Sequence, residues 1–207
     1  LRFSLLELAH VEGFNRSPSD VTASRLMKYG LAPAIKQAFE EVYKAPFIVK
    51  ILLAELGTKP GRDVFLTANY DGAFEETTGY AVLAATPAVQ VEMADYVKQE
   101  RRSASVSLAQ ALDIAVRAWA VGSLAQRSVQ ADEDTEDAND GPTRAHKASA
   151  PDDHRLTAHL RETIGDKTIE CAVLERHAPG SSKYRPLKQD EVLHFLPADL
   201  KIVKEQQ

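Results

Sequence analysis

Asp152, Asp153 and His154, followed closely by His159, combine carboxylates and imidazoles and could be interpreted as a weak metal-binding group. Carboxylates and imidazoles bind zinc, but this spacing matches no familiar zinc pattern and no cysteine lies nearby. The composition of the segment is instead typical of a solvated loop. We therefore expect these residues to be solvated, and we expect neither a metal nor a cofactor. The isolated histidines are expected at surface or partly buried positions: His10, His177 and His194.

Hydroxyl and thiol groups are the next candidates for chemistry. A hydrolase that uses its own N-terminal residue needs Ser, Thr or Cys there, because the free amine serves as the base. Leu1 offers no such group, so the chain as given cannot perform that reaction. Cys171 has apolar neighbours and is expected to be a buried, inert thiol. The internal threonines are expected at helix caps or in strands, so no catalytic residue is predicted: Thr22, Thr67, Thr77 and Thr78.

Composition excludes several classes of protein. The 207 residues are 44% hydrophobic and 27% charged, which is ordinary for a globular domain. No apolar run is long enough to cross a membrane, and no signal peptide is visible. The basic surface that nucleic-acid binding requires is also missing, so we expect no nucleic-acid partner. One cysteine cannot form an internal disulfide, which favours the reducing cytoplasm.

Apolar periodicity and capping signals place the helices. We predict the end of an amphipathic helix at 1–10, and a second helix from Ser19 or Asp20 to about Tyr43, kinked or divided by Gly30 and Pro33. Further helices are predicted from Thr86-Pro87 to Glu100, from the capping-box pair Ser107 and Gln110 to about Gln126, and over 189–196. The apolar face of the helix that ends near Gln126 carries Trp119, which is expected in the core unless this helix faces a neighbouring chain.

Strands are predicted between these helices. The first three cover 47–56, 64–70 and 78–85, and the turn Tyr70-Asp71-Gly72 ends the second. Short connections imply that these strands pair antiparallel. Two later strands are predicted at 168–177 and 183–187. The order of helices, antiparallel strands, helices and strands predicts an α+β fold.

An acidic segment interrupts the second half of the chain. Residues 128–153 contain eight carboxylates and two cations, so the formal charge of this segment is −6. The formal charge of the whole chain is −5, so the remaining residues together carry +1. The segment has no periodicity and too few apolar residues to offset the entropy of ordering. We predict a disordered acidic loop at about 128–157 within a single domain that spans residues 1–207.

Several short motifs, in order and with matching spacing, resemble proteasome core-particle α subunits of the bacterial type. The resemblance covers roughly 1–125 and 168–196. The motifs that carry it are Leu1-Arg2 with Gly13-Phe14 and Asp20-Val21-Thr22, Lys44-Ala45-Pro46-Phe47 with Ala54-Glu55, Tyr70-Asp71-Gly72, Ser107-Leu108 with Ala111-Leu112 and Ile114-Ala115-Val116, and Glu170 with Ala172-Val173-Leu174.

This resemblance implies a four-layer αββα sandwich of the N-terminal-nucleophile hydrolase type, whose first strands are missing from this chain. It implies a non-catalytic ring subunit that controls substrate entry to a proteasome core particle in the cytoplasm. The implied partners are copies of itself in a homo-oligomeric ring, proteasome β subunits, an ATPase activator and unfolded protein substrates.

Two alternatives remain open at this point. The chain could be a β-type threonine protease subunit, or another N-terminal-nucleophile hydrolase, truncated before its catalytic threonine. It could also be a divergent proteasome-like protein with another role, to which the acidic loop and the helix breakers Gly30 and Pro33 would point.

Overall fold

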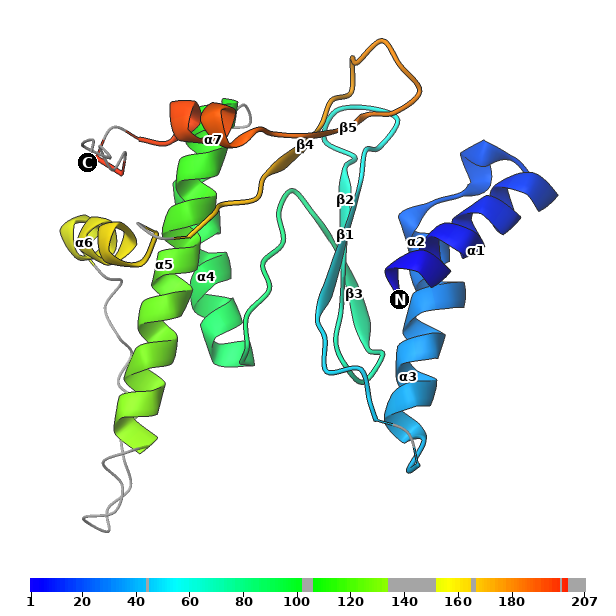
Figure 1. Ribbon diagram of the computed structural model, residues 1–207, viewed down its shortest axis with the longest axis horizontal. Helices are drawn as coiled ribbons and strands as arrows, with labels where there is room; N and C mark the ends of the chain where they lie inside the picture. The colour runs from blue at the N-terminus through cyan, green and yellow to red at the C-terminus, as the bar shows by residue number, and fades with distance from the viewer. Residues whose placement is uncertain (44, 102–105, 134–151, 165–166, 198, 201–207) are drawn as a thin grey trace, which may run out of the picture. The chain divides into compact units, whose positions relative to one another are not determined.

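The computed structural model describes residues 1–43, 45–101, 106–133, 152–164, 167–197 and 199–200, with side chains left undescribed at 129–133. Within these ranges the chain forms an α+β structure of helices and two small antiparallel sheets (Figure 1). It divides into two compact units, Leu1–Leu83 and Ala84–Gln207. No helix in the described part is long and apolar enough to cross a membrane.

The helical part of unit 1 is α1 (Arg2–Asn15), a 3₁₀ turn η1 (Pro18–Asp20), α2 (Ala23–Leu26), a π-helical turn η2 (Met27–Leu31) and α3 (Ala32–Glu40). The Thr22 hydroxyl accepts a hydrogen bond from Arg25 N–H, so Thr22 is the N-cap. The prediction that Ser19 or Asp20 caps this helix was therefore wrong, because the 3₁₀ turn η1 comes first and the α-helix begins after Thr22. The predicted interruption at Gly30 and Pro33 is confirmed, and it is a π turn between two α-helices.

Gly30 and Pro33 have a clear structural role in this interruption. A Cβ on Gly30 would overlap the end of the Leu8 side chain on α1, so a larger residue here would oblige Leu8 to move. Pro33 lies in the first turn of α3, directly after the π turn, and it has no N–H to donate to the preceding turn.

The sheet of unit 1 has the order β1-β2-β3, with strands Ile51–Glu55, Val64–Ala68 and Phe74–Thr78. Both pairings are antiparallel, as predicted. The buried side chains of the helices pack on this sheet as one cluster: Met27, Leu31, Ala32, Ile35, Leu66 and Ala68. Gly72 closes the predicted turn with a φ of +81°, a conformation that favours glycine.

Two strand predictions need correction. The first strand begins at Ile51 rather than at 47, because Phe47 and Ile48 are exposed and outside the sheet. The third strand is Phe74–Thr78 rather than 78–85. The tight turn at Gly72 obliges the chain to pair with β2 at once, although Glu75 and Glu76 give this strand little hydrophobic character.

Unit 2 contains α4 (Pro87–Glu100), α5 (Leu108–Glu133), α6 (Asp153–Ile164), β4 (Ala172–Leu174), β5 (Tyr184–Pro186) and α7 (Gln189–Phe195). The predicted bounds of α4 are confirmed, with Thr86 as its cap. The capping box at Ser107 and Gln110 is also present, with reciprocal bonds of 2.9 and 3.3 Å. Both later strands are shorter than predicted but pair antiparallel.

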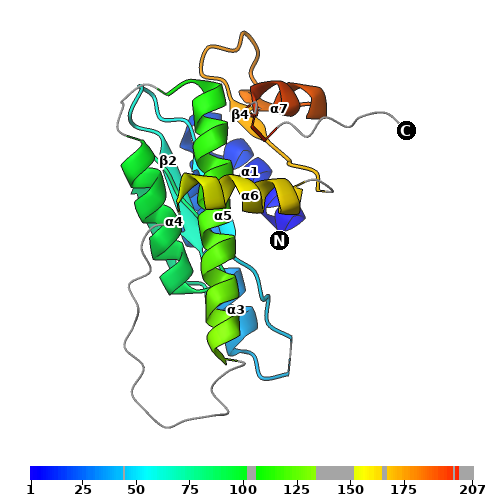
Figure 2. The same cartoon turned by 90° about the vertical axis from the view of Figure 1, so that its left-hand side faces the viewer.

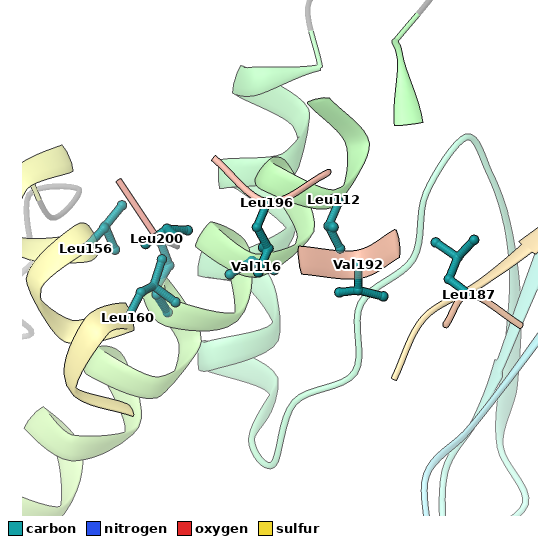
Figure 3. Close-up of a cluster of buried hydrophobic side chains, with 10 residues drawn as sticks. Leu112, Val116, Leu156, Leu160, Leu187, Val192, Leu196 and Leu200 are labelled. Atoms are coloured by element: carbon teal, nitrogen blue, oxygen red, sulfur yellow. The ribbon is translucent and has the colours of Figure 1, made fainter. Parts of the chain in front are cut away.

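The core of unit 2 joins the long helix α5 to α6, α7 and the residues that follow β5 and α7. Figure 3 shows side chains of α5 and α6 gathered with Leu196 and Leu200. The buried members are Leu112, Val116, Ala120, Val121, Leu156, Leu160, Leu187, Val192, Leu196 and Leu200. This is the larger of the two clusters.

The predicted acidic loop is shorter than expected. Helix α5 continues past Gln126 to Glu133, and α6 begins at Asp153, so both ends of the range 128–157 are helical. Leu156 and Leu160 explain the second end, because they give α6 an apolar face that the charge of the segment obscured. Residues 134–151, where the rest of the prediction falls, lie outside the described residues.

Candidate functional site

A cavity of about 400 Å³ lies in unit 2 between α5 and the extended segment 167–171. Leu112, Ala115, Val116 and Trp119 line it from α5, since residues at this spacing share one helix face. The opposite side is formed by Ile164, Lys167, Thr168, Ile169, Glu170 and Cys171. The cavity is therefore apolar along the helix and carries one cation and one carboxylate along the segment.

Trp119 lies at this cavity and not in the core. Its side chain is 40% exposed, and its ring stacks on His159 with centroids 6.2 Å apart and planes inclined by 15°. The Lys167 ammonium lies 5.7 Å from the centre of the indole, as a cation–π contact. The prediction of a core tryptophan was wrong, because helical periodicity identifies an apolar face but not whether anything covers it.

His159 lies in α6 and is buried, so the prediction of a solvated loop is wrong for this residue. Its Nε2 lies 3.0 Å from the Ser123 hydroxyl on α5. Burial lowers the pKa of His159, and the positive charge of Arg127 adds to that effect. The imidazole is consequently neutral at neutral pH.

The Ser123–His159 contact does not have the surroundings of a nucleophile. Ser123 lies within α5, where neighbouring backbone N–H groups are engaged in helical hydrogen bonds and cannot stabilise an oxyanion. A catalytic serine also needs a base oriented by a third group. The contact therefore acts as a link between two helices.

Arg117 on α5 holds together three parts of unit 2. The guanidinium binds Asp113 at 2.7 Å, Asp153 at 2.6 Å and Asp199 at 3.0 Å, and also donates to Thr157. Burial disfavours the charge, but the hydrogen bond and the charge of Asp113 outweigh it and raise the pKa of Arg117. Asp153, considered above as a metal ligand, is thus an ion-pair partner in the first turn of α6.

The other members of the predicted group are separate from this ion pair. His154 is exposed on α6, on a different side of the helix from buried His159. No group of three metal-ligating side chains occurs among the described residues.

Cys171 is half-buried at the cavity and just before β4, so the prediction of a buried thiol in a strand was wrong. Partial burial still raises the pKa of its thiol, which disfavours the reactive thiolate. The threonines lie where they were predicted. Thr22 is a helix cap, and the other three lie in strands: Thr67 in β2, and Thr77 and Thr78 in β3. Thr67 donates to Glu75 and Thr77 to the Tyr80 carbonyl, so these hydroxyls support the hairpin.

A second candidate site is the exposed surface of α1 in unit 1. This helix has no fully buried residue. Phe14 is 91% exposed and Phe3 is 84% exposed, and Leu6 and Val11 flank them on the same side of the helix. We call these four side chains the α1 stripe. Exposed large apolar side chains that share one helix face indicate a candidate association surface.

Sequence reasoning missed the Arg117 and His159 contacts. The spacing of Asp113 and Arg117 on a helix could have indicated their ion pair. Asp153, Asp199 and Ser123 meet their partners only through the packing of α6 and the C-terminal turn on α5, which no local pattern encodes.

Comparison with known proteins gives several relatives with the same description. A protein named proteasome subunit alpha from Kineococcus radiotolerans is 30% identical over 182 residues, which cover 85% of this chain and 63% of that protein. Proteins of the same name from Streptosporangium roseum and Frankia casuarinae are 31% and 30% identical over 116 and 122 residues, covering 42% and 48% of their lengths. The chain thus spans roughly half of the curated relatives it matches. No protein-family model matches the chain.

Proposed function

Since this chain is a relative of the bacterial proteasome alpha subunits, we propose that it is a non-catalytic α-type ring subunit of a proteasome core particle. The observation that carries the proposal is this relationship, which extends over 85% of the chain in the Kineococcus protein. The α1 stripe supports it, because a ring subunit must offer surface to its neighbours.

The proposed mechanism is compartmentalisation. Copies of the chain form a closed ring that caps a ring of β subunits, an ATPase activator docks on the outer side, and unfolded protein enters through a gated pore in the cytoplasm. Peptide-bond hydrolysis belongs to the β subunits. The environments of Thr22, Cys171 and Ser123 support a role without catalysis for this chain.

We also propose that the complete domain is the four-layer αββα sandwich of the N-terminal-nucleophile hydrolase type. In this proposal each unit supplies one helix layer and one sheet: α2 and α3 with β1–β3, and α5 and its neighbours with β4–β5. In this proposal residues 1–207 are a single domain that is incomplete at its N-terminus, with the acidic loop as an insertion.

The cavity of unit 2 supports this arrangement. The Cys171 carbonyl accepts a hydrogen bond from Leu187 N–H, which extends the β4–β5 pairing by one residue, so segment 167–171 leads directly into β4. A two-stranded sheet is marginal by itself. A further strand along segment 167–171 would enlarge the sheet and place its side chains in the cavity against Leu112 and Val116. We assign this strand to sequence outside residues 1–207.

Two measurements test the proposal. Native mass spectrometry of the full encoded protein should show a closed homo-oligomer, and a double substitution in the α1 stripe, Phe3→Ser with Phe14→Ser, should abolish it. Val91→Ser, which removes an exposed apolar side chain from α4, is the matched control and should leave the oligomer intact. A protein that is monomeric, alone and with β subunits, would refute the ring assignment.

The second measurement is the coding sequence upstream of Leu1. A tail, a helix and two strands there would support the gated α subunit and the missing strands. A propeptide followed by threonine would instead identify the body of a catalytic β subunit.

A further inference from the structure

Helix α6 is attached to α5 by three kinds of contact. Figure 2 shows α6 lying across α5. The first is apolar: Leu156 and Leu160 pack in the core and are 1% and 0% exposed. The second is polar: Asp153 and Thr157, near the start of α6, bind Arg117. His159 supplies the third contact, through Ser123 and the ring of Trp119.

Protonation of the His159 imidazole can alter the third contact. The His159 side chain is enclosed by Ser123 and Trp119, and its surroundings are mostly positive. Arg127 acts on it from α5, Arg155 from α6 and Lys167 from segment 167–171, while Glu162 on α6 is the opposing carboxylate. An added proton would place a buried cation among three others.

We propose that His159 is a proton-sensitive latch that holds α6 firmly on α5 at neutral pH and loosens it at mildly acidic pH. Imidazole is the side chain whose charge changes in this range. Loosening exposes apolar side chains of α5 that now share a buried cluster with Leu156 and Leu160, so the latch controls access to an apolar surface. This inference does not depend on the proposed ring function.

The direction of the effect follows from the environment of the ring. Because the pKa of His159 is lowered in the attached state, the detached state binds more protons. The contribution of His159 is therefore complete above about pH 6.5, the ordinary value for a free imidazole, and is lost as the pH falls toward the lowered pKa.

Hydrogen exchange of the complete chain tests the latch. Amides of α6 should lose protection severalfold, after correction for intrinsic exchange, between about pH 7.5 and about pH 5. Amides of α4 should change little over the same range. Trp119 is the only tryptophan, so its fluorescence reports the stacked imidazole directly and should change with the same midpoint.

Two variants distinguish the effect of His159 protonation from the effects of other titratable groups. His159→Gln keeps an amide that can bond Ser123 but cannot titrate, and should make α6 protection and Trp119 fluorescence independent of pH. His154→Gln removes an exposed histidine from the same helix and should leave the wild-type pH dependence unchanged.

Either of two results would overturn the proposal: α6 protection in the wild type that does not change with pH, or the same pH dependence in His159→Gln. If His159→Gln does not fold, the NMR titration of His159 in the wild type decides the question. Its midpoint must lie below about 6.5, the ordinary pKa of a free imidazole, and a midpoint at or above that value would refute the latch.

Discussion

The two compact units use their apolar side chains differently. In unit 2 the apolar faces of α5, α6 and α7 meet in a ten-residue buried cluster, whereas unit 1 buries six residues and leaves every residue of α1 incompletely covered. Among the described residues, thirteen of the seventeen exposed large hydrophobic side chains belong to unit 1. Unit 2 is therefore stabilised mainly by its own contacts, and unit 1 carries the surface suited to association.

The largest expected effect is in the core of unit 2. Leu160→Ala removes a side chain that is 0% exposed and should lower the free energy of unfolding by about 2–5 kcal/mol. Urea unfolding followed by circular dichroism measures this change. The control is Leu193→Ala on α7, which is 45% exposed and should cost far less. Equal losses would mean that unit 2 is not organised around this cluster.

The ion-pair centre of unit 2 should give the next largest effect. Arg117→Met leaves Asp113, Asp153 and Asp199 without their shared partner and should cost about 1–2 kcal/mol, a reduced value because the three carboxylates remain partly exposed to solvent. Thermal unfolding and hydrogen exchange of α6 amides measure the loss.

Arg185→Met is the matched control for that variant. Arg185 also binds two carboxylates, Glu175 at 2.7 Å and Glu191 at 2.9 Å, but at the surface. Its removal should have the smaller effect on stability. The opposite order would contradict the view that Arg117 organises unit 2.

A glycine pair tests how closely the hairpin of unit 1 packs on its helices. Gly72 and Gly61 both have a φ of +81°, so alanine strains the backbone at either position by about 1–2 kcal/mol. At Gly72 the new Cβ would also lie 2.7 Å from the Ala32 carbonyl oxygen, whereas at Gly61 it meets open space. Chemical denaturation should therefore show a greater loss for Gly72→Ala than for Gly61→Ala.

The smallest effect on folding, and the largest on assembly, is expected from the α1 stripe. Phe14→Ser should change the free energy of unfolding of the isolated chain by no more than about 0.5 kcal/mol, because its side chain is 91% exposed. Sedimentation velocity should nevertheless show weaker association. A large loss of stability in the monomer would show that α1 belongs to the core after all.

The sequence predicted best those features that local chemistry determines. Thr86-Pro87 and the Ser107–Gln110 box located the starts of α4 and α5, because capping involves residues only three apart. The turn at Gly72 was located for the same reason. The relationship to bacterial proteasome alpha subunits was also recognised from short ordered motifs, and the comparisons confirm it.

Features that the sequence did not predict depend on contacts between distant residues. The apolar run at Phe47 and Ile48 is typical of a strand, yet no partner strand pairs with it among the described residues. Asp153 resembled part of a loop because its ion-pair partner, Arg117, lies 36 positions earlier. His159 and Trp119 meet only because α6 packs across α5, so the stacked pair and the neighbouring cavity had no signal in the sequence.

The π turn Met27–Leu31 has a consequence for how this chain tolerates changes in length. Such a turn contains one residue more than an α-helical turn, and a helix adopts it when a residue is inserted while the next turns keep their orientation. Met27 and Ile35, on either side of Gly30, both remain fully buried against the same sheet. A homologue that lacks one residue in this region can therefore keep the same core, with a continuous α-helix in place of the bulge.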